Sequence, residues 1–436
     1  MHHAPQTAIG ASAFDRPRNS SSQIALASFV GTAIEFYDFY VYAIAAALVI
    51  GPVFFPSDSP TAQSLNAFAT FGIAFLARPI GSFLFGHFGD RFGRKSTLVA
   101  TLLTMGICTT LIGLLPGYDR IGELAPWLLA LLRIGQGLGL GGEWGGAALL
   151  ATENAPSGRR GVFGMFPQLG PSIGFLVANG LFLLLGLLLS HEAFLAWGWR
   201  IPFVASGVLV IIGLYARLKL AETPLFEQTR HARVPLAELL GRHLKPLILG
   251  SLSIVVCYAL FYISAVFVLS YGIGKLHIPK PALQGWLMAA IVLMAVGTAF
   301  SAWLSDRFGR RPVLVVSGLA AVLWGFTLAP LLGSATAEGA GVFLCGALLL
   351  MGLTYAPLGA MLPEIFPTVV RYTGAGAAYN LGGILGASLA PYAAQVLVSR
   401  GGLSWVGGYI SIAAIISLIA VIALGETRQR DLAQVV

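Results

Sequence analysis

The sequence is poor in charge, since Asp, Glu, Lys and Arg together make up 10% of its 436 residues. A soluble domain carries about 25% charged residues, so this chain has too few to cover a water-facing surface of its size. Hydrophobic residues reach 57%, which excludes a disordered chain, because such chains are charge-rich and poor in apolar residues. The composition therefore predicts a polytopic membrane protein whose first partner is the lipid bilayer.

Cysteine is also scarce. Cys108, Cys257 and Cys345 lie far apart inside apolar runs, which fits neither a disulfide framework nor a metal site. The net charge is +8, but the basic residues lie in short clusters between apolar runs. Signals that orient a protein in the membrane lie in such places, so we expect no nucleic-acid partner. No metal and no cofactor are expected.

Twelve apolar runs are long enough to cross a membrane, which takes about 20 mostly apolar residues. They predict an all-α fold with twelve transmembrane helices in two pseudo-symmetric six-helix bundles. The runs are 24–50, 63–86, 96–116, 125–150, 161–189, 201–218, 246–271, 283–304, 312–332, 341–362, 372–398 and 403–424.

Lysine and arginine indicate the orientation. Of the 26, 19 lie on the same side as the N-terminus, including Arg217 at the end of the sixth run and Arg230 and Arg233 beyond it. Five lie on the other side, and Arg78 and Arg133 lie within spans. Because basic residues favour the cytoplasmic side, both termini are predicted to be cytoplasmic in a multi-pass protein of the inner membrane.

The longest polar break divides the chain. We expect an N-terminal cytoplasmic tail at 1–22, a first bundle at 23–218, a cytoplasmic linker at 219–245, a second bundle at 246–424 and a C-terminal tail at 425–436. The end of the linker, PLAELLGRHLK, could form a short surface helix. The halves repeat, because GHFGDRFGRK at 86–95 recurs as AWLSDRFGRR at 302–311. Such repeats build one large group of secondary transporters, with the substrate site between the halves.

The repeated motif suggests a breakable charge lock on the cytoplasmic face. A glycine such as Gly86 allows close helix packing, and Asp90 can sit near a helix N-terminus, where negative charge is stabilised. Asp90 and Arg94 should contact partners on the inner loops that include Glu153, and the second copies, Asp306 and Arg310, should contact Glu364. A basic membrane anchor is the alternative role. The predicted lock comprises Gly86, Asp90, Arg91, Gly93, Arg94, Lys95, Glu153, Arg160, Asp306, Arg307, Gly309, Arg310, Arg311, Glu364 and Arg371.

The first copy resembles the fingerprint of the major facilitator superfamily at every fixed position, and the second departs only at Ala302. Further stretches are similar to the metabolite:H⁺ symporter branch, which includes porters for shikimate, α-ketoglutarate, citrate, and proline or betaine. They are EFYDFYVY (35–42), FLARPIGSFLFGHFGDRFGRK (75–95), RIGQGLGLGGEWGGAALL (133–150), WGWRIPF (197–203) and PEIFPTVVRYTGAG (363–376). The resemblance covers about 24 to 428. It implies the fold, proton coupling and a small organic solute, with protons as the coupling ion.

Charged residues inside spans are costly and mark pathways. Glu35 lies about 16 Å into the first span, and Asp38 follows one turn later on nearly the same face. Arg133, in a stretch that resembles the superfamily's proton-coupling motif, is expected to pair with Asp38 or Glu35. Asp38 is the first choice for the proton carrier, Glu35 the second, and Glu143 is a further candidate; static ion pairs are the alternative.

Cations and polar groups within the spans are candidates for solute binding. Arg133, with a planar fork that suits a carboxylate, and Arg78 would favour a small organic acid or zwitterion. The predicted solute-binding residues are Arg78, Arg133, Tyr37, Gln136, Gln168, Tyr258, Tyr262, Tyr355 and Asn380, with Asn179 and Tyr379 as further polar groups.

These features predict a proton-coupled symporter that imports its solute by alternating access and functions as a monomer. A proton-coupled antiporter or exporter uses the same buried carboxylates, and a non-transporting sensor could share the fold. A membrane enzyme is not expected, because no HExxH pattern or midplane histidine pair occurs, and no Walker loop supports an ATP-driven pump.

Overall fold

The computed structural model describes residues 20–56, 60–219 and 235–432. These residues form helices joined by short loops and contain no β-strand. The predicted all-α fold is confirmed. Most of the predicted linker, residues 220–234, lies outside the described residues, as do the Arg230 and Arg233 counted toward the orientation. The last part of the linker forms the helix α11 (Pro235–Arg242).

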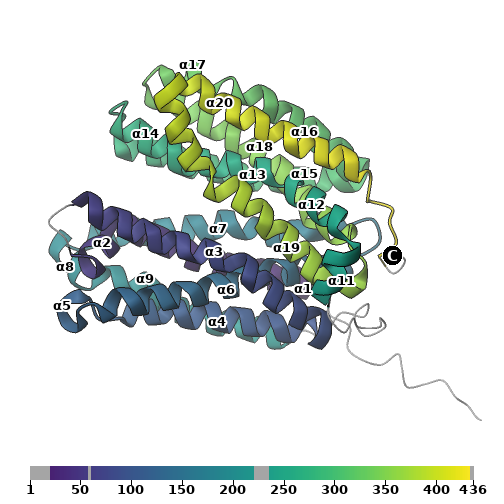
Figure 1. Ribbon diagram of the computed structural model, residues 1–436, viewed down its shortest axis with the longest axis horizontal. Helices are drawn as coiled ribbons and strands as arrows, with labels where there is room; N and C mark the ends of the chain where they lie inside the picture. Colours follow the sequence, from purple (N-terminus) through teal and green to yellow (C-terminus); the bar gives the residue numbers. More distant parts are fainter. Residues whose placement is uncertain (1–19, 57–59, 220–234, 433–436) are drawn as a thin grey trace, which may run out of the picture.

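The first six predicted spans correspond to one bundle of long helices (Figure 1). Short helices connect them at one end, α2 (Gly51–Phe54), α5 (Tyr118–Ile121) and α8 (His191–Ala196). The long helices are α1 (Ser21–Ala45), α3 (Pro60–Phe92), α4 (Arg94–Leu114), α6 (Leu124–Glu153), α7 (Arg160–Leu188) and α9 (Ile201–Leu218).

The second bundle has the same plan but more interruptions. Its first pass changes from α12 to α13 to a π-helical turn to α14, and its fifth pass contains a π-helical turn after α19. The helices are α12 (Leu244–Ser253), α13 (Val255–Tyr262), α14 (Leu269–Gly274), α15 (Lys280–Phe308), α16 (Arg310–Gly325), α17 (Leu328–Gly333), α18 (Ala337–Glu364), α19 (Arg371–Gly383) and α20 (Ala390–Leu424).

Eleven described stretches are long and apolar enough to span a membrane, and the last runs for 57 residues from Thr368 to Leu424. An uninterrupted helix of that length would measure about 85 Å, far more than the roughly 30 Å of a hydrocarbon core. The backbone leaves the helical conformation at Gly402, where φ is 72° and ψ is −171°. The stretch is therefore two passes, which gives the expected twelve.

The two bundles lie side by side, with α7 next to the second bundle (Figure 1). Between them α3 packs against α19, while α7 packs against α15 and α18. All the Gly-Asp-Arg motif residues lie at the end where α3 and α15 finish and α4 and α16 begin, here called the motif end. The short helices α5, α8, α14 and α17 lie at the opposite end. The interface therefore runs the length of the molecule.

Close packing inside the first bundle depends on small residues. A Cβ added at Gly141 of α6 would overlap the carbonyl oxygen of Arg78 in α3, so the two backbones touch directly. Close backbone approach of this kind is how membrane helices associate without a hydrophobic driving force. The contact also fixes the depth of Arg78 relative to α6.

Gly141→Ala should therefore destabilise the fold by about 1–3 kcal/mol, the usual cost of overpacking, because the obstacle is backbone. Gly72→Ala in α3 is the matched control, since a Cβ there meets nothing within 4 Å. The measurement is thermal unfolding of the purified variants in detergent. Equal melting temperatures for Gly141→Ala and Gly72→Ala would show that α3 and α6 separate at no cost.

Candidate functional site

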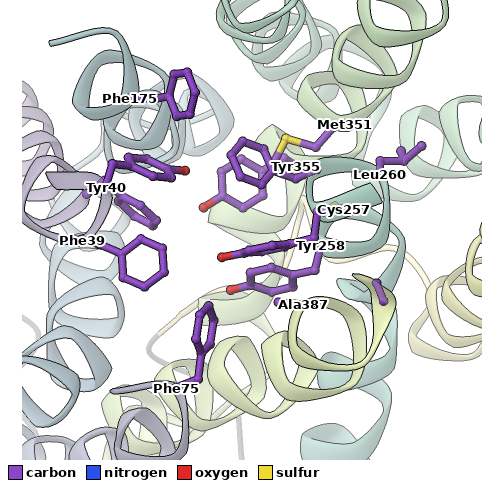
Figure 2. Packing of buried hydrophobic residues seen from close by; sticks show 14 of the residues in the cluster. Phe39, Tyr40, Phe75, Phe175, Cys257, Tyr258, Leu260, Met351, Tyr355 and Ala387 are labelled. Atoms are coloured by element: carbon purple, nitrogen blue, oxygen red, sulfur yellow. The ribbon is translucent and has the colours of Figure 1, made fainter. Parts of the chain in front are cut away.

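Aromatic side chains from both bundles meet halfway along the interface. Figure 2 shows the tyrosines of the second bundle opposite Phe39, Tyr40, Phe75 and Phe175 of the first. The ring centroids of Phe75 and Tyr262 lie 5.9 Å apart across the interface. We call this cluster the aromatic interface; it consists of Phe39, Tyr40, Phe75, Phe175, Tyr258, Tyr262, Tyr355 and Tyr379, all buried.

Arg78 is the cation of the aromatic interface. Its guanidinium carbon lies 5.5 Å from the ring centre of Phe75, and its Nε donates to the Oδ1 of Asn380 over 3.2 Å. Among the described residues, its Nη2 and the Tyr258 hydroxyl have no hydrogen-bond partner although both are buried. Two donors of this kind fit an anionic ligand, because an unsatisfied buried donor is costly.

A polar chain behind the aromatic interface connects the bundles. Trp144 of α6 donates from its indole nitrogen to Gln168, and Gln168 donates to the carbonyl of Tyr355 in α18, with distances of 2.7 and 2.8 Å. Trp144 also stacks on Tyr379 at 4.0 Å between ring centres. The sequence analysis did not select Trp144, although the glycines around it (GGEWGG) are the signal that allows this close approach.

Glu35 and Asp38 are the most unusual charged residues of the protein. Both are 0% exposed, and neither carboxyl oxygen of either residue has a hydrogen-bond partner among the described residues. Ser206 and Thr109 lie beside Asp38, and Arg78 and Arg217 lie near Glu35, but none is within hydrogen-bonding geometry. A buried ionised carboxylate without such bonds is strongly disfavoured. Glu35 and Asp38 are therefore the carboxyls whose burial the described contacts leave uncompensated.

Arg133 does not pair with Asp38 or Glu35, contrary to the sequence-based expectation. It donates to the carbonyl oxygens of Thr70 and Phe71 and to Gln136, and its guanidinium lies 3.7 Å from the ring centre of Tyr42. Backbone carbonyls in the first half of α3 thus satisfy Arg133 where the prediction assumed a carboxylate. Gln136, in turn, donates to Thr109.

Glu143 is held by a partner that the sequence analysis missed. Arg217, near the end of α9, donates from both Nη atoms to the Glu143 carboxylate, and Thr101 donates to the same carboxylate over 2.6 Å. Arg217 had been counted as an orientation signal, but it is 2% exposed. A Glu–Arg pair 74 residues apart in the chain leaves no local sequence pattern, so only the fold reveals it.

The structure does not bring Tyr37 to the aromatic interface. Its hydroxyl donates to the carbonyl of Pro202 at the start of α9, inside the first bundle, over 2.8 Å. Asn179, named among the further polar groups, donates to the sulfur of Met288 across α7 and α15. The other predicted solute-binding residues gather at the aromatic interface or, as Gln136 does, beside Arg133.

At the motif end, Asp90 joins the bundles through a helix N-terminus. It accepts from the backbone N–H groups of Tyr372 and Thr373 in the first turn of α19, over 3.1 and 2.9 Å, and from the Thr373 hydroxyl. The macrodipole of α19 stabilises a negative charge there. A Cβ at Gly86 would lie 2.8 Å from the Cα of Thr373, so glycine allows the approach.

The second bundle repeats this contact in the opposite direction. Asp306 of α15 accepts from the N–H groups of Gly161 and Val162, at the start of α7, over 2.7 and 2.8 Å. Glu426 accepts in the same way from Arg310 and Arg311 at the start of α16. Burial alone would raise the pKa of Glu426, but these backbone donors bring its pKa below the ordinary value.

Ion pairs complete the motif end. Arg94 and Arg371 both contact Glu153, over 3.0 and 3.2 Å, and Arg371 belongs to the second bundle. Arg310 contacts Glu364 at 3.1 Å, and Arg160 approaches Glu364 from the first bundle at 3.9 Å. The predicted contacts of Arg94 with Glu153 and of Arg310 with Glu364 are confirmed. Asp90 and Asp306, in contrast, contact helix N-termini and not these glutamates.

The other motif residues make contacts within their own bundles. Gly93 and Gly309 have φ values of 115° and 105°, which only glycine adopts readily, and they turn the chain between consecutive helices. Lys95 donates to the carbonyl of Leu218. Arg91 and Arg307 lie on the rings of Phe92 and Phe308, so these two arginines do not join the bundles.

Two six-helix bundles with an ionic closure at one end and a buried polar site at their interface define a major facilitator transporter. The sugar (and other) transporter family matches residues 24–238 and 227–435, and the chain belongs to this family. Like its relatives, it is a transporter of metabolites and not an enzyme.

Curated relatives align over almost the whole chain. The inner membrane metabolite transport protein YhjE of Escherichia coli (strain K12) is 52% identical, covering 95% of this chain and 97% of its own. The shikimate transporter of the same strain is 37% identical over 93% and 94% of the two chains. Its proline/betaine transporter is 34% identical over 93% and 84%.

Solved structures confirm the fold. The proton:xylose symporter XylE, bound to 6-bromo-6-deoxy-D-glucose, superposes with a TM-score of 0.80 at 17% identity, covering 95% of this chain and 98% of that chain. FucP in the outward conformation gives a TM-score of 0.65 at 16% identity, covering 92% and 100%. At this identity the likeness concerns the fold alone.

The contact of Asp90 with α19 should control how often the motif end opens. In Asp90→Asn the carbonyl oxygen can accept from at most two of the three donors, and the charge that the helix dipole favours is lost. Charged hydrogen bonds contribute about 1.5–3 kcal/mol each, so the open population should rise at least tenfold. Spin labels at Ser96 and Pro312, in a variant with its three cysteines replaced, would report the distance between the bundles.

Asp119→Asn, an exposed carboxylate at the opposite end, is the control for this measurement. If the distance between the two spin labels is the same in Asp90→Asn as in the unmodified protein, the motif is no lock and serves only as a basic membrane anchor.

Proposed function

We propose that this protein is a proton-coupled symporter of the inner membrane that imports a small organic acid or zwitterion by alternating access. The motif end faces the cytoplasm, as the distribution of Lys and Arg indicates, and both termini lie there. The observation that carries the proposal is the pair of wholly buried carboxyls, Glu35 and Asp38, which have no hydrogen bond among the described residues.

Solute recognition is assigned to Arg78 in this proposal. Its unpartnered Nη2 and the Tyr258 hydroxyl supply donors for one carboxylate, and the surrounding rings enclose the solute body. A solute cation, as in betaine, would rest against the rings through cation–π contacts. Relatives are named as transporters of shikimate and of proline and betaine. Each of these solutes contains a carboxylate, which supports the assignment.

The energy of the proton gradient suffices for accumulation. A proton that moves inward through 100 mV releases about 2.3 kcal/mol. Since about 1.4 kcal/mol corresponds to a factor of ten, one proton per cycle concentrates a neutral solute roughly 40- to 50-fold. Coupling requires that a carboxyl binds its proton when the site faces outward and releases it when the motif end opens.

Asp38→Asn should abolish accumulation driven by a pH gradient and retain exchange of solute down its gradient, because asparagine stays neutral throughout the cycle. The assay uses proteoliposomes and radiolabelled shikimate, glycine betaine, proline and α-ketoglutarate, with counterflow measured in parallel. If Asp38→Asn still accumulates solute against its gradient while Glu35→Gln does not, Asp38 is structural and Glu35 carries the proton.

Arg78→Lys should weaken solute binding at least tenfold, because a point charge replaces the planar fork that matches a carboxylate. Thermal-shift titration with the same four compounds would measure the loss. Lys275→Ala, outside the interface, is the control. If Arg78→Lys binds these solutes with unchanged affinity, the anion site lies elsewhere.

A further inference from the structure

Arg217 lies where it can serve two carboxyl groups. Its guanidinium bonds Glu143 of α6 and the carbonyl of Leu98 in α4. The guanidinium also lies against α1, because a Cβ added at Gly31 would overlap its Nη2 atom. The guanidinium therefore rests directly on the α1 backbone, in the space that the missing side chain leaves.

Gly31 and Glu35 are four residues apart in α1, so they lie one above the other on the same helix face. Arg217 thus sits one turn from Glu35, on the side of the motif end. The two Glu35 oxygens have no hydrogen bond, whereas Glu143 has bonds from Arg217 and Thr101. A guanidinium has five N–H donors. One Nη2 hydrogen goes to Glu143, and the other side of Nη2 faces α1.

We propose that Glu35, Glu143 and Arg217 form a proton-binding triad in which Arg217 replaces the proton on Glu35. In the structure described, Glu143 holds the guanidinium and Glu35 carries the proton. When the motif end opens, the O–H bond of Glu35 breaks, the proton passes to water on that side, and the carboxylate left behind accepts from Nη2. The guanidinium keeps its charge and bridges the two glutamates. This triad rests on the proposed function, because it specifies how Glu35, the second buried carboxyl, binds and releases a proton beside Asp38.

The charges around the triad support this division of roles. Besides Arg217 and Glu143, the charged groups near Glu35 are Arg78 from α3 and Asp38 from α1 itself. The helices α4 and α7, which also pack within this bundle, have no charged residue beyond their first turn. Arg78 faces the aromatic interface and bonds Asn380, so Arg217 is the cation on the motif side of Glu35.

The triad is tested with protons as the probe, so no solute needs to be known. The carboxyl C=O infrared band of purified protein in lipid vesicles is followed against pH, and Glu35→Gln identifies the part of the band that belongs to Glu35. Gly31→Ala pushes Arg217 off α1, so the protonated Glu35 band should persist to higher pH by about one unit, a tenfold change in proton affinity. Glu143→Gln leaves Arg217 to Glu35 alone, so the band should vanish at lower pH by a similar amount.

Gly180→Ala in α7, where a Cβ meets nothing within 4 Å, is the control and should titrate as the unmodified protein does. If Gly31→Ala does not fold, the opposite shift in Glu143→Gln tests the triad independently. If the Glu35 band disappears at the same pH in Gly31→Ala and Glu143→Gln as in the unmodified protein, the triad is overturned and the proposed function stays intact. If no titrating band is lost in Glu35→Gln, then Glu35 binds no proton and the triad fails while Asp38 remains as the carrier.

Discussion

The cost of burying charge in a membrane protein organises this molecule. An ionised side chain inside a span needs partners, and most of the buried charges here have them. Arg133 is satisfied by backbone carbonyls, Glu143 by Arg217 and a hydroxyl, and Asp90 by a helix N-terminus. Against this background Glu35 and Asp38 stand out, because neither carboxyl has a hydrogen bond among the described residues, and the proposed proton coupling rests on them.

The same requirement couples the bundles. At the motif end the backbone N–H groups that donate to Asp90 and Asp306 belong to the opposite bundle, so opening this end would expose the N-termini of α19 and α7 and the two carboxylates at once. Water can then replace each lost partner, which makes the closure reversible. At the aromatic interface, by contrast, the cross-bundle contacts are mostly between rings, and a solute can substitute for them. In the proposed cycle, solute binding and closure therefore act on one interface at different depths.

Much of the fold followed from the sequence, because spans are set by length and hydropathy and the bundles by a visible repeat. Contacts at the motif end could also be predicted where both partners lie in repeated motifs, as for Arg94 with Glu153. The partners of Arg133, Glu143 and Tyr37 could not. Each depends on how far one helix is shifted along another, and on backbone carbonyls that any residue supplies, so residue type gave no sign of them.

The central claim, that the solute enters at the aromatic interface together with a proton on the first bundle, is tested most directly in a weakly buffered suspension of proteoliposomes. Adding the transported solute at zero membrane potential should make the medium more alkaline as protons enter with it, and the double variant Glu35→Gln/Asp38→Asn should show no such change while still exchanging solute. Solute entry without alkalinisation in the unmodified protein, or acidification, would contradict the account, the latter in favour of antiport.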